Sequence, residues 1–233
     1  MRKFITVLLT VCSALFFIFG PAWFLPHLHE DLYSLKESRA EPQFEGLLTL
    51  WNVSDTPAGA ARQLSYAIAR FEKEQTHVFI TRINMNAKTA QRRLAEGETP
   101  DIIVFDKSGL VSGLSLRALE VPPNLLPAVA ETGCREEQFV ALPFAVIPHK
   151  NEEETEITLS CAYAACVEST DVLRQNMIDA FFETLLSSRV QQHAAEHGLV
   201  PVCADENLFE TESEQSQIYR LLAAQELSLP QLF

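Results

Sequence analysis

The segment Ala95–Asp106 constrains the fold of this chain more than any other part of the sequence. It begins as the polar end of a helix that runs into Gly97. Pro100 then prevents further helix, and the apolar run Ile102–Phe105 follows. This pattern predicts a helix that leads into a buried parallel strand, which ends at the carboxylate of Asp106. Ligands of open α/β sheets bind outside the carboxyl ends of such strands, so Asp106 marks an edge where a site is expected.

The segments before this junction alternate between strand and helix patterns. Residues 46–51 and 78–83 are apolar runs that predict two further strands. Apolar residues between them recur at the spacing of one helix face, and residues 88–96 predict a short helix. This β-α-β-α-β order predicts an α/β fold, with helices flanking a mostly parallel sheet and right-handed crossovers.

The pattern after Asp106 is less regular. For residues 109–119 a helix is the only regular element expected. The apolar run 139–147 predicts a strand that Pro143 interrupts, and the proline indicates an edge strand, a bulge or a hinge. Residues 157–167 predict another strand. A long helix is expected within 171–197, ended by Gly198, and a last helix near 215–226.

Three segments carry motifs that occur together in one family. The first runs from LTLW at 48–51, through a helix ending in FEKE at 71–74, to GETPD at 97–101. The second is ALPF at 141–144, and the third is AFFETLLSSRVQ at 180–191 followed by GLVPV at 198–202. In this order they resemble the bacterial extracellular solute-binding proteins, the receptors of ABC importers. The resemblance covers about residues 46–202 and implies a type 2 periplasmic-binding-protein fold.

One departure from this family changes the expected architecture. The resemblance implies an entire second α/β lobe between the second and third segments, whereas only residues 145–179 separate them here. We therefore expect a single lobe at 46–203, preceded by a membrane segment at 1–25 and a tether at 26–45, and followed by a C-terminal extension with a helix at 204–233. Solute-binding proteins enclose their solute by closing two lobes about a hinge, and one lobe offers only an open shelf.

Four residues are predicted to contact a ligand on that shelf. Trp51 and Asn52 end the first predicted strand, and Asp106 and Lys107 follow the third. An aromatic residue at this place in the family often stacks on a sugar or another solute. The alternative is that Trp51 belongs to the core, and that Asp106 and Lys107 form a plain turn.

The sequence HAAEH at 193–197 matches an inverted zinc-peptidase motif. His193 and His197 share a helix face and could hold Zn²⁺, with Glu196 as the base. The simpler interpretation is a helix end, where histidines interact favourably with the helix dipole before Gly198. A zinc hydrolase is thus a remote alternative, and the prediction is that the chain is not an enzyme and needs no cofactor.

Charge and cysteine content exclude some functions. The formal net charge is -13, which argues against nucleic-acid partners, because these require a basic surface. No C-x-x-C pair is present among the five cysteines, so the usual zinc and thioredoxin motifs are absent. The cysteines outside the N-terminal segment are interpreted as buried free thiols, with a bridge between Cys134 and Cys203 as the alternative.

Arg2 and Lys3 precede an apolar run from Phe4 to Leu25, which is about the 20 residues that a transmembrane helix needs. No Ala-x-Ala cleavage site is present, and Trp23 suits the membrane interface. The expected topology is a single-pass signal anchor with the domain on the extracytoplasmic side of the cell membrane; a cleaved signal peptide is the alternative.

Together these patterns predict an extracytoplasmic solute-binding-protein-like module linked to ABC-type import, through weak ligand binding or docking to a transporter. The expected partners are a small solute, either a sugar or a peptide, and an ABC permease. The alternative is a non-transport interaction module that has kept the fold and lost the ligand.

The anchor prediction can be checked directly. Phe4–Leu25 should stay attached to the mature protein, because its apolar length suits a membrane span and a cleavage motif is missing. Intact-mass measurement of protein from its native host should give the full-length chain. A mature chain that begins between Pro21 and Ala40 would contradict the prediction.

Overall fold

A computed structural model describes residues 44–53, 58–109, 111–150, 157–205, 208–209 and 212–233. Residues 44–233 belong to one compact unit. The predicted anchor Phe4–Leu25 lies outside the described residues, and so does the predicted tether up to Gln43. Within the described ranges, no helix combines the length and the apolar character that a membrane span requires.

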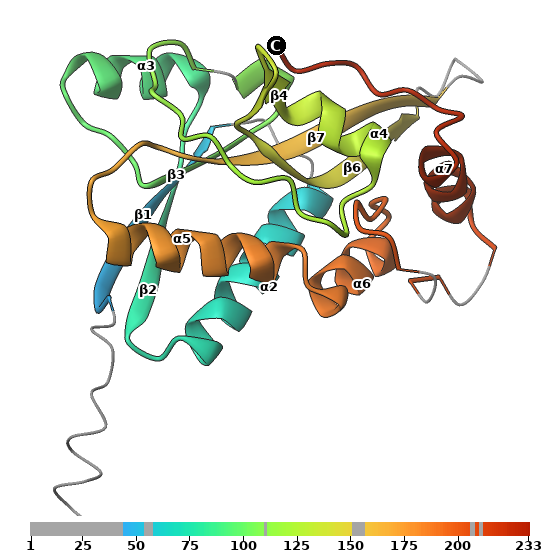
Figure 1. Cartoon of the computed structure of the whole chain (residues 1–233), viewed down its shortest axis with the longest axis horizontal. Coiled ribbons are helices and arrows are strands. Elements are labelled where there is room, and N and C mark those ends of the chain that lie inside the picture. Colours follow the sequence, from blue (N-terminus) through green and yellow to red (C-terminus); the bar gives the residue numbers. More distant parts are fainter. Residues whose placement is uncertain (1–43, 54–57, 110, 151–156, 206–207, 210–211) are drawn as a thin grey trace, which may run out of the picture. The chain divides into compact units, whose positions relative to one another are not determined.

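Strands and helices alternate along the first half of this unit, and a hairpin followed by helices forms the second (Figure 1). In chain order the elements are β1 (Gly46–Val53), α2 (Ala58–Glu74), β2 (Val78–Asn84), α3 (Ala87–Ala95), β3 (Ile102–Phe105), the 3-10 turn η1 (Lys107–Gly109), α4 (Pro127–Ala130), the 3-10 turn η2 (Glu131–Gly133), β4 (Cys134–Arg135), β5 (Gln138–Phe139), β6 (Leu142–Lys150), β7 (Ile157–Cys166), α5 (Val172–Leu185), α6 (Ser188–Glu196) and α7 (Glu214–Ala223).

The main sheet has five strands in the order β2-β1-β3-β7-β6. β1 pairs in parallel with β2 and β3, as the alternating sequence predicts. β7 pairs antiparallel with both β3 and β6, so the sheet is mixed and the expected mostly parallel sheet is only partly right. The physical reason is that β6 and β7 form a hairpin, which reverses direction without a crossover helix.

Helices cover both faces of this sheet. β2 and β3 lie on opposite sides of β1, so right-handed crossovers place α2 and α3 on opposite faces. α5 packs on the same face as α2, where the rings of Phe71 and Phe181 meet edge to face with centroids 5.5 Å apart. The apolar stripe predicted along α2 is buried there, including Ala60, Leu64 and Ala67.

The helix-to-strand junction at Ala95–Asp106 forms as predicted. Gly97 follows the C-cap of α3 with φ +86°, a backbone conformation that residues with a Cβ rarely adopt. Asp101 then stabilises the turn into β3: its Oδ2 accepts a hydrogen bond from the Thr49 backbone N–H (2.7 Å), and its Oδ1 pairs with Nη1 of Arg174 (2.8 Å). The carboxylate therefore joins β1 to the first turns of α5.

The long helix expected within 171–197 is two helices. α5 ends at Leu185, and α6 begins at Ser188 after the N-cap Ser187. Gly198 follows α6 with φ +80°, as expected for a residue that ends a helix. The expected helix within 109–119 is not present beyond η1, and the described residues between Val111 and Leu126 contain no helix.

Pro143 marks both an edge and a bulge, as its position within an apolar strand predicts. β6 is an edge strand of the sheet, and its pairing with β7 shifts between Pro143 and Ala145, so that Phe144 is the extra residue of a β-bulge. Two buried glutamines hold this bulge. Gln63 of α2 and Gln191 of α6 each donate from Nε2 to the Phe144 carbonyl, both at 3.1 Å.

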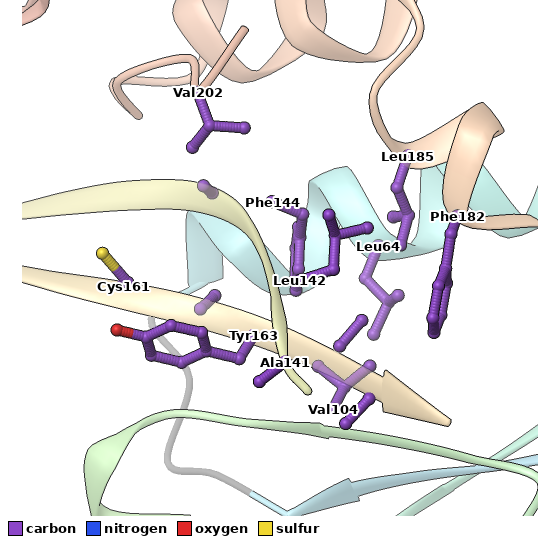
Figure 2. Packing of buried hydrophobic residues seen from close by; sticks show 14 of the residues in the cluster. Leu64, Val104, Ala141, Leu142, Phe144, Cys161, Tyr163, Phe182, Leu185 and Val202 are labelled. Carbon is purple, nitrogen blue, oxygen red and sulfur yellow. The ribbon is translucent and has the colours of Figure 1, made fainter. Parts of the chain in front are cut away.

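Around the bulge, apolar side chains from three elements form the centre of the core. Figure 2 shows Leu142 and Phe144 of β6 beside Leu64 of α2, with Leu185 of α5 on the same side. All four side chains are fully or almost fully buried. The core therefore depends on the edge strand β6 as much as on the central strands.

The four cysteines of the described residues are free thiols, three buried and Cys134 half-buried, as expected from the main interpretation. Burial raises the pKa of Cys161 and of Cys166 to about 11, and that of Cys203 to about 12. These thiols are neutral at physiological pH and unsuited to nucleophilic chemistry.

Replacing Gln191 with leucine should destabilise the protein by about 2–4 kcal/mol, because the change leaves the backbone groups of Leu185 and Val202 without their side-chain partner, and the Phe144 carbonyl with Gln63 alone. Urea denaturation followed by circular dichroism measures the change. Gln192→Leu, at the exposed neighbouring position on α6, is the matched control and should change stability little. Equal effects of the two substitutions would contradict the role of the bulge.

Candidate functional site

The carboxyl ends of β1, β2 and β3 lie side by side at one edge of the sheet. Asn52 pairs in register with Asn84 of β2 and with Val104 of β3. Asp106 and Lys107 follow β3 directly, so the fold brings all four residues predicted for the ligand site to this edge. Their individual environments differ in ways that the sequence does not reveal.

Trp51 is a core residue in this structure. Its side chain is 1% exposed, and it lies between Ile83 and Ile103 in the registers of the two neighbouring strands. An indole that stacks on a sugar must present one face to solvent, and this one does not. Trp51 therefore lies where the alternative interpretation, a core residue, places it. Ligand contact at Trp51 stays a prediction.

Asn52 is also buried, at 5% exposed, but it belongs to a polar chain that reaches the surface. Its Nδ2 donates to Oδ1 of Asn84 (2.9 Å), which also accepts from Nε of Arg82 (2.8 Å). Asn84 is exposed at the end of β2. The sequence analysis did not identify Asn84 or Arg82; the signal that could have found them is that parallel strands of similar length end at the same edge.

Asp106 caps the turn that follows β3. Its Oδ1 accepts a hydrogen bond from the backbone N–H of Gly109 (2.9 Å). Gly109 is required there, because a Cβ at this position would lie 1.5 Å from the carbonyl oxygen of Val53. The turn thus presses against the end of β1 and covers part of the edge. Lys107 is the one exposed member of the predicted set.

The edge therefore offers Asn84, Lys107 and the half-buried Asp106 to solvent, above a closed apolar layer. Such groups can donate and accept hydrogen bonds with a polar solute. Among the described residues they form a shelf without an opposing wall, so water competes for each of these hydrogen bonds. Ligand contact at Trp51, Asn52, Asp106 and Lys107 stays a prediction.

The HxxEH motif forms a ring stack rather than a metal centre. The imidazoles of His193 and His197 stack with centroids 4.1 Å apart, and His193 stacks on Tyr66 of α2 at 4.3 Å. His197 Nδ1 donates to the His193 carbonyl at 2.8 Å. The described residues contain no group of three or more His, Cys, Asp or Glu side chains that could hold a metal ion. The geometry accordingly favours a helix end that packs against α2.

Beyond the shelf, the hairpin of β6 and β7 projects past the sheet edge. β3 pairs only with residues 163–166 of β7, whereas the pairing of β6 with β7 continues to Lys150↔Ile157. The segment that in the resembling family leads to a second lobe therefore turns back after residues 151–156 and returns directly as β7.

Solved structures of similar fold include several carbohydrate-binding proteins. The cyclic α-maltosyl-1,6-maltose binding protein from Arthrobacter globiformis matches with a TM-score of 0.60 and 10% identity, covering 81% of this chain and 89% of that one. The GacH receptor of Streptomyces glaucescens, solved free and with acarbose, matches with a TM-score of 0.59 and 10% identity, covering 81% and 88%. The ABC substrate-binding protein Lmo0181 from Listeria monocytogenes, solved with cycloalternan, matches with a TM-score of 0.59 and 7% identity, covering 81% and 89%.

The chain has the fold of the solute-binding proteins of ABC importers. No protein-family model matches the sequence, and no curated protein matches it. Identities of 7–10% are low enough that the likeness concerns the fold. The resemblance noted in the sequence motifs is thereby confirmed at the level of architecture.

Acidification should weaken the contact between α6 and α2. Burial, and then the neighbouring His197, lower the pKa of His193, with Arg62 adding to the effect and Glu196 opposing it. The unfolded chain therefore takes up this proton before the folded one, so stability is complete above the unfolded pKa of about 6.5 and falls as the pH drops below it. Urea denaturation between pH 8 and pH 5 measures this slope, which should be smaller in His193→Gln. An unchanged slope would contradict the assignment.

Proposed function

We propose that this protein is a one-lobed solute-binding-protein-like module of an ABC-type import system, which acts by docking to a transporter or partner protein rather than by enclosing a solute. The observation that carries the proposal is the β6–β7 hairpin. Its ladder runs without a gap from Ala145↔Ala162 to Lys150↔Ile157, and six residues join its two strands.

Enclosure of a solute requires two walls that close on each other. The six residues between β6 and β7 are far too few for a second α/β lobe, and the described residues at the ends of β1 and β3 leave the shelf open to water. The buried position of Trp51 supports the same conclusion, because the aromatic surface best suited to a sugar is part of the core. What the module retains is a rigid framework with extensive surfaces, which suits protein docking.

Weak carbohydrate binding is the second candidate function. The solved structures of similar fold include proteins with maltose, acarbose and cycloalternan. The exposed polar groups at the strand edge, Asn84 and Lys107, are of the kind that sugar hydroxyls use as hydrogen-bond partners. On this proposal the protein keeps a shallow remnant of a sugar site.

The proposed location is the extracytoplasmic face of the cell membrane, with Phe4–Leu25 as the anchor. Its apolar composition and length support this proposal. An anchored module also stays close to membrane-embedded transporters, which raises the effective concentration for docking.

The docking proposal is tested by photo-crosslinking of the full-length chain in native membranes. A photoreactive amino acid placed at exposed positions should give a specific crosslink to an ABC permease subunit. A crosslink to a membrane protein that is not a transporter would instead support the non-transport interaction module. Absence of any crosslink from positions distributed over all faces would overturn the docking function.

Solute binding should be weak, with a dissociation constant on the order of 0.1 mM or higher, because few contacts offset the lost translational freedom. Isothermal titration calorimetry with maltose-type oligosaccharides measures it. Lys107→Ala should weaken any binding further, and Lys73→Ala, at an exposed position in the last turn of α2 and so at the other edge of the sheet, is the matched control. Micromolar binding by the monomer would show that one lobe suffices for capture.

A further inference from the structure

The geometry points to a trough beside the second half of α5 as a binding site for a basic, extended peptide segment of a partner protein. This inference rests on the proposed docking function and names the surface and the partner chemistry. The trough is separate from the shelf. One wall of the trough is the segment 117–124, which is hydrogen-bonded to Cys166 through the Arg117 backbone. Cys166 pairs with Ile102 at the start of β3, whereas the shelf lies at the end of β3.

Two adjoining cavities form the trough. The first has a volume of about 730 Å³ and lies between the segment 117–124 and the second half of α5. The second has a volume of about 310 Å³ and continues toward Asp205. Asn124, Leu186 and Ser188 line both cavities, so the two lie next to each other. The first alone is within the range of about 300–1,000 Å³ that is typical of ligand sites, and the continuation favours an elongated occupant.

The wall of the trough is held in place by backbone hydrogen bonds. Arg117 N–H donates to the Cys166 carbonyl at 2.9 Å, and Leu119 N–H donates to the Phe139 carbonyl at 2.7 Å. At the other end, Ala204 N–H donates to the carbonyl of Asn124 at 2.7 Å. A wall fixed at both ends loses little conformational entropy on binding, which favours affinity.

The floor of the trough is apolar. Leu142, Phe182 and Leu186 close it from below, and each is buried. At the rim, Val121 is 52% exposed, a high value for a large apolar side chain on a folded domain. An occupant with alternating apolar and polar side chains can cover Val121 and keep its polar groups toward solvent.

The charge of the trough selects a basic occupant. Glu120, of the segment 117–124, and Glu183, of α5, are exposed on the two walls, and Asp179 lines the first cavity one turn before Glu183. Among the described residues that line this cavity, Arg117 is the only Lys or Arg, and it is paired with Asp179. Asp205 adds a carboxylate in the second cavity. Lysine or arginine side chains of a peptide would meet carboxylates on both sides, whereas a neutral sugar gains nothing from them.

The test uses the full-length chain in nanodiscs of phosphatidylcholine, a zwitterionic lipid that does not itself attract basic peptides. The probe is a fluorescent peptide of about eight alternating Lys and Leu residues, which spans about 25 Å when extended. A Glu-Leu peptide of equal length is the charge control, and empty nanodiscs are the background. Fluorescence anisotropy measures affinity, and a benzophenone version of the probe maps the site by mass spectrometry.

The variant Glu120→Lys/Glu183→Lys should weaken binding of the Lys-Leu peptide at least about tenfold at low salt, because both exposed charges are reversed, and the difference should shrink at high salt. Glu96→Lys/Glu98→Lys is the charge-matched control, since these two glutamates are exposed at the end of α3, the helix on the sheet face opposite α2. The control variant should bind the Lys-Leu peptide as tightly as the unchanged protein does. Crosslinks of the benzophenone probe to the unchanged protein should fall within residues 117–124 and 182–188.

Equal binding by the double variant, equal binding of the Glu-Leu peptide, or crosslinks confined to other segments would overturn the inference. So would the absence of Lys-Leu binding above the empty-nanodisc background. Crosslinking of the double variant in native membranes distinguishes failure of the trough as a docking surface from failure of the docking function itself. If its transporter crosslink persists while peptide binding is absent, docking stands and the trough is not its surface; if no partner crosslink forms with the unchanged chain, the docking function itself is wrong.

Discussion

The carbonyl oxygen of Phe144 is the point at which the edge strand, two helices and the chain after α6 are joined. A β-bulge removes this carbonyl from the ladder with β7, and a buried carbonyl without a partner is costly. Gln63 and Gln191 both donate to it, and Gln191 also accepts from the Val202 backbone N–H at 2.9 Å. α2 and α6 are thereby held on the same side of β6, and the order of the remaining layers depends on that attachment.

Local signals in the sequence were sufficient for elements whose conformation is decided within a few residues. Gly97 and Pro100 specified the end of α3 and the start of β3, and Gly198 specified the end of α6. The direction of β7 was not readable in this way, because the strand's own residues are equally apolar in a parallel or an antiparallel pair. The break at Ser187 was missed for a similar reason: the apolar spacing continues across it, although α6 begins anew there and packs on α2.

The candidate site shows a different limit of sequence reasoning. The edge was located correctly, since the register places Asn52, Asn84 and the residues after β3 together. The burial of Trp51 was not predictable, because it depends on which elements pack over β1, and these come from other parts of the chain. The trough beside α5 was missed altogether: its walls come from segments some sixty residues apart, and nothing in either segment signals a cavity.

The β6–β7 hairpin makes the tip after Lys150 a natural graft point for protein engineering. The two strand ends are already held in register, so an inserted domain whose termini lie close together would add only a slowly growing loop-closure entropy. The core around Phe144 is complete without such an insert. The domain can therefore serve as a scaffold on which a foreign domain is mounted next to the shelf.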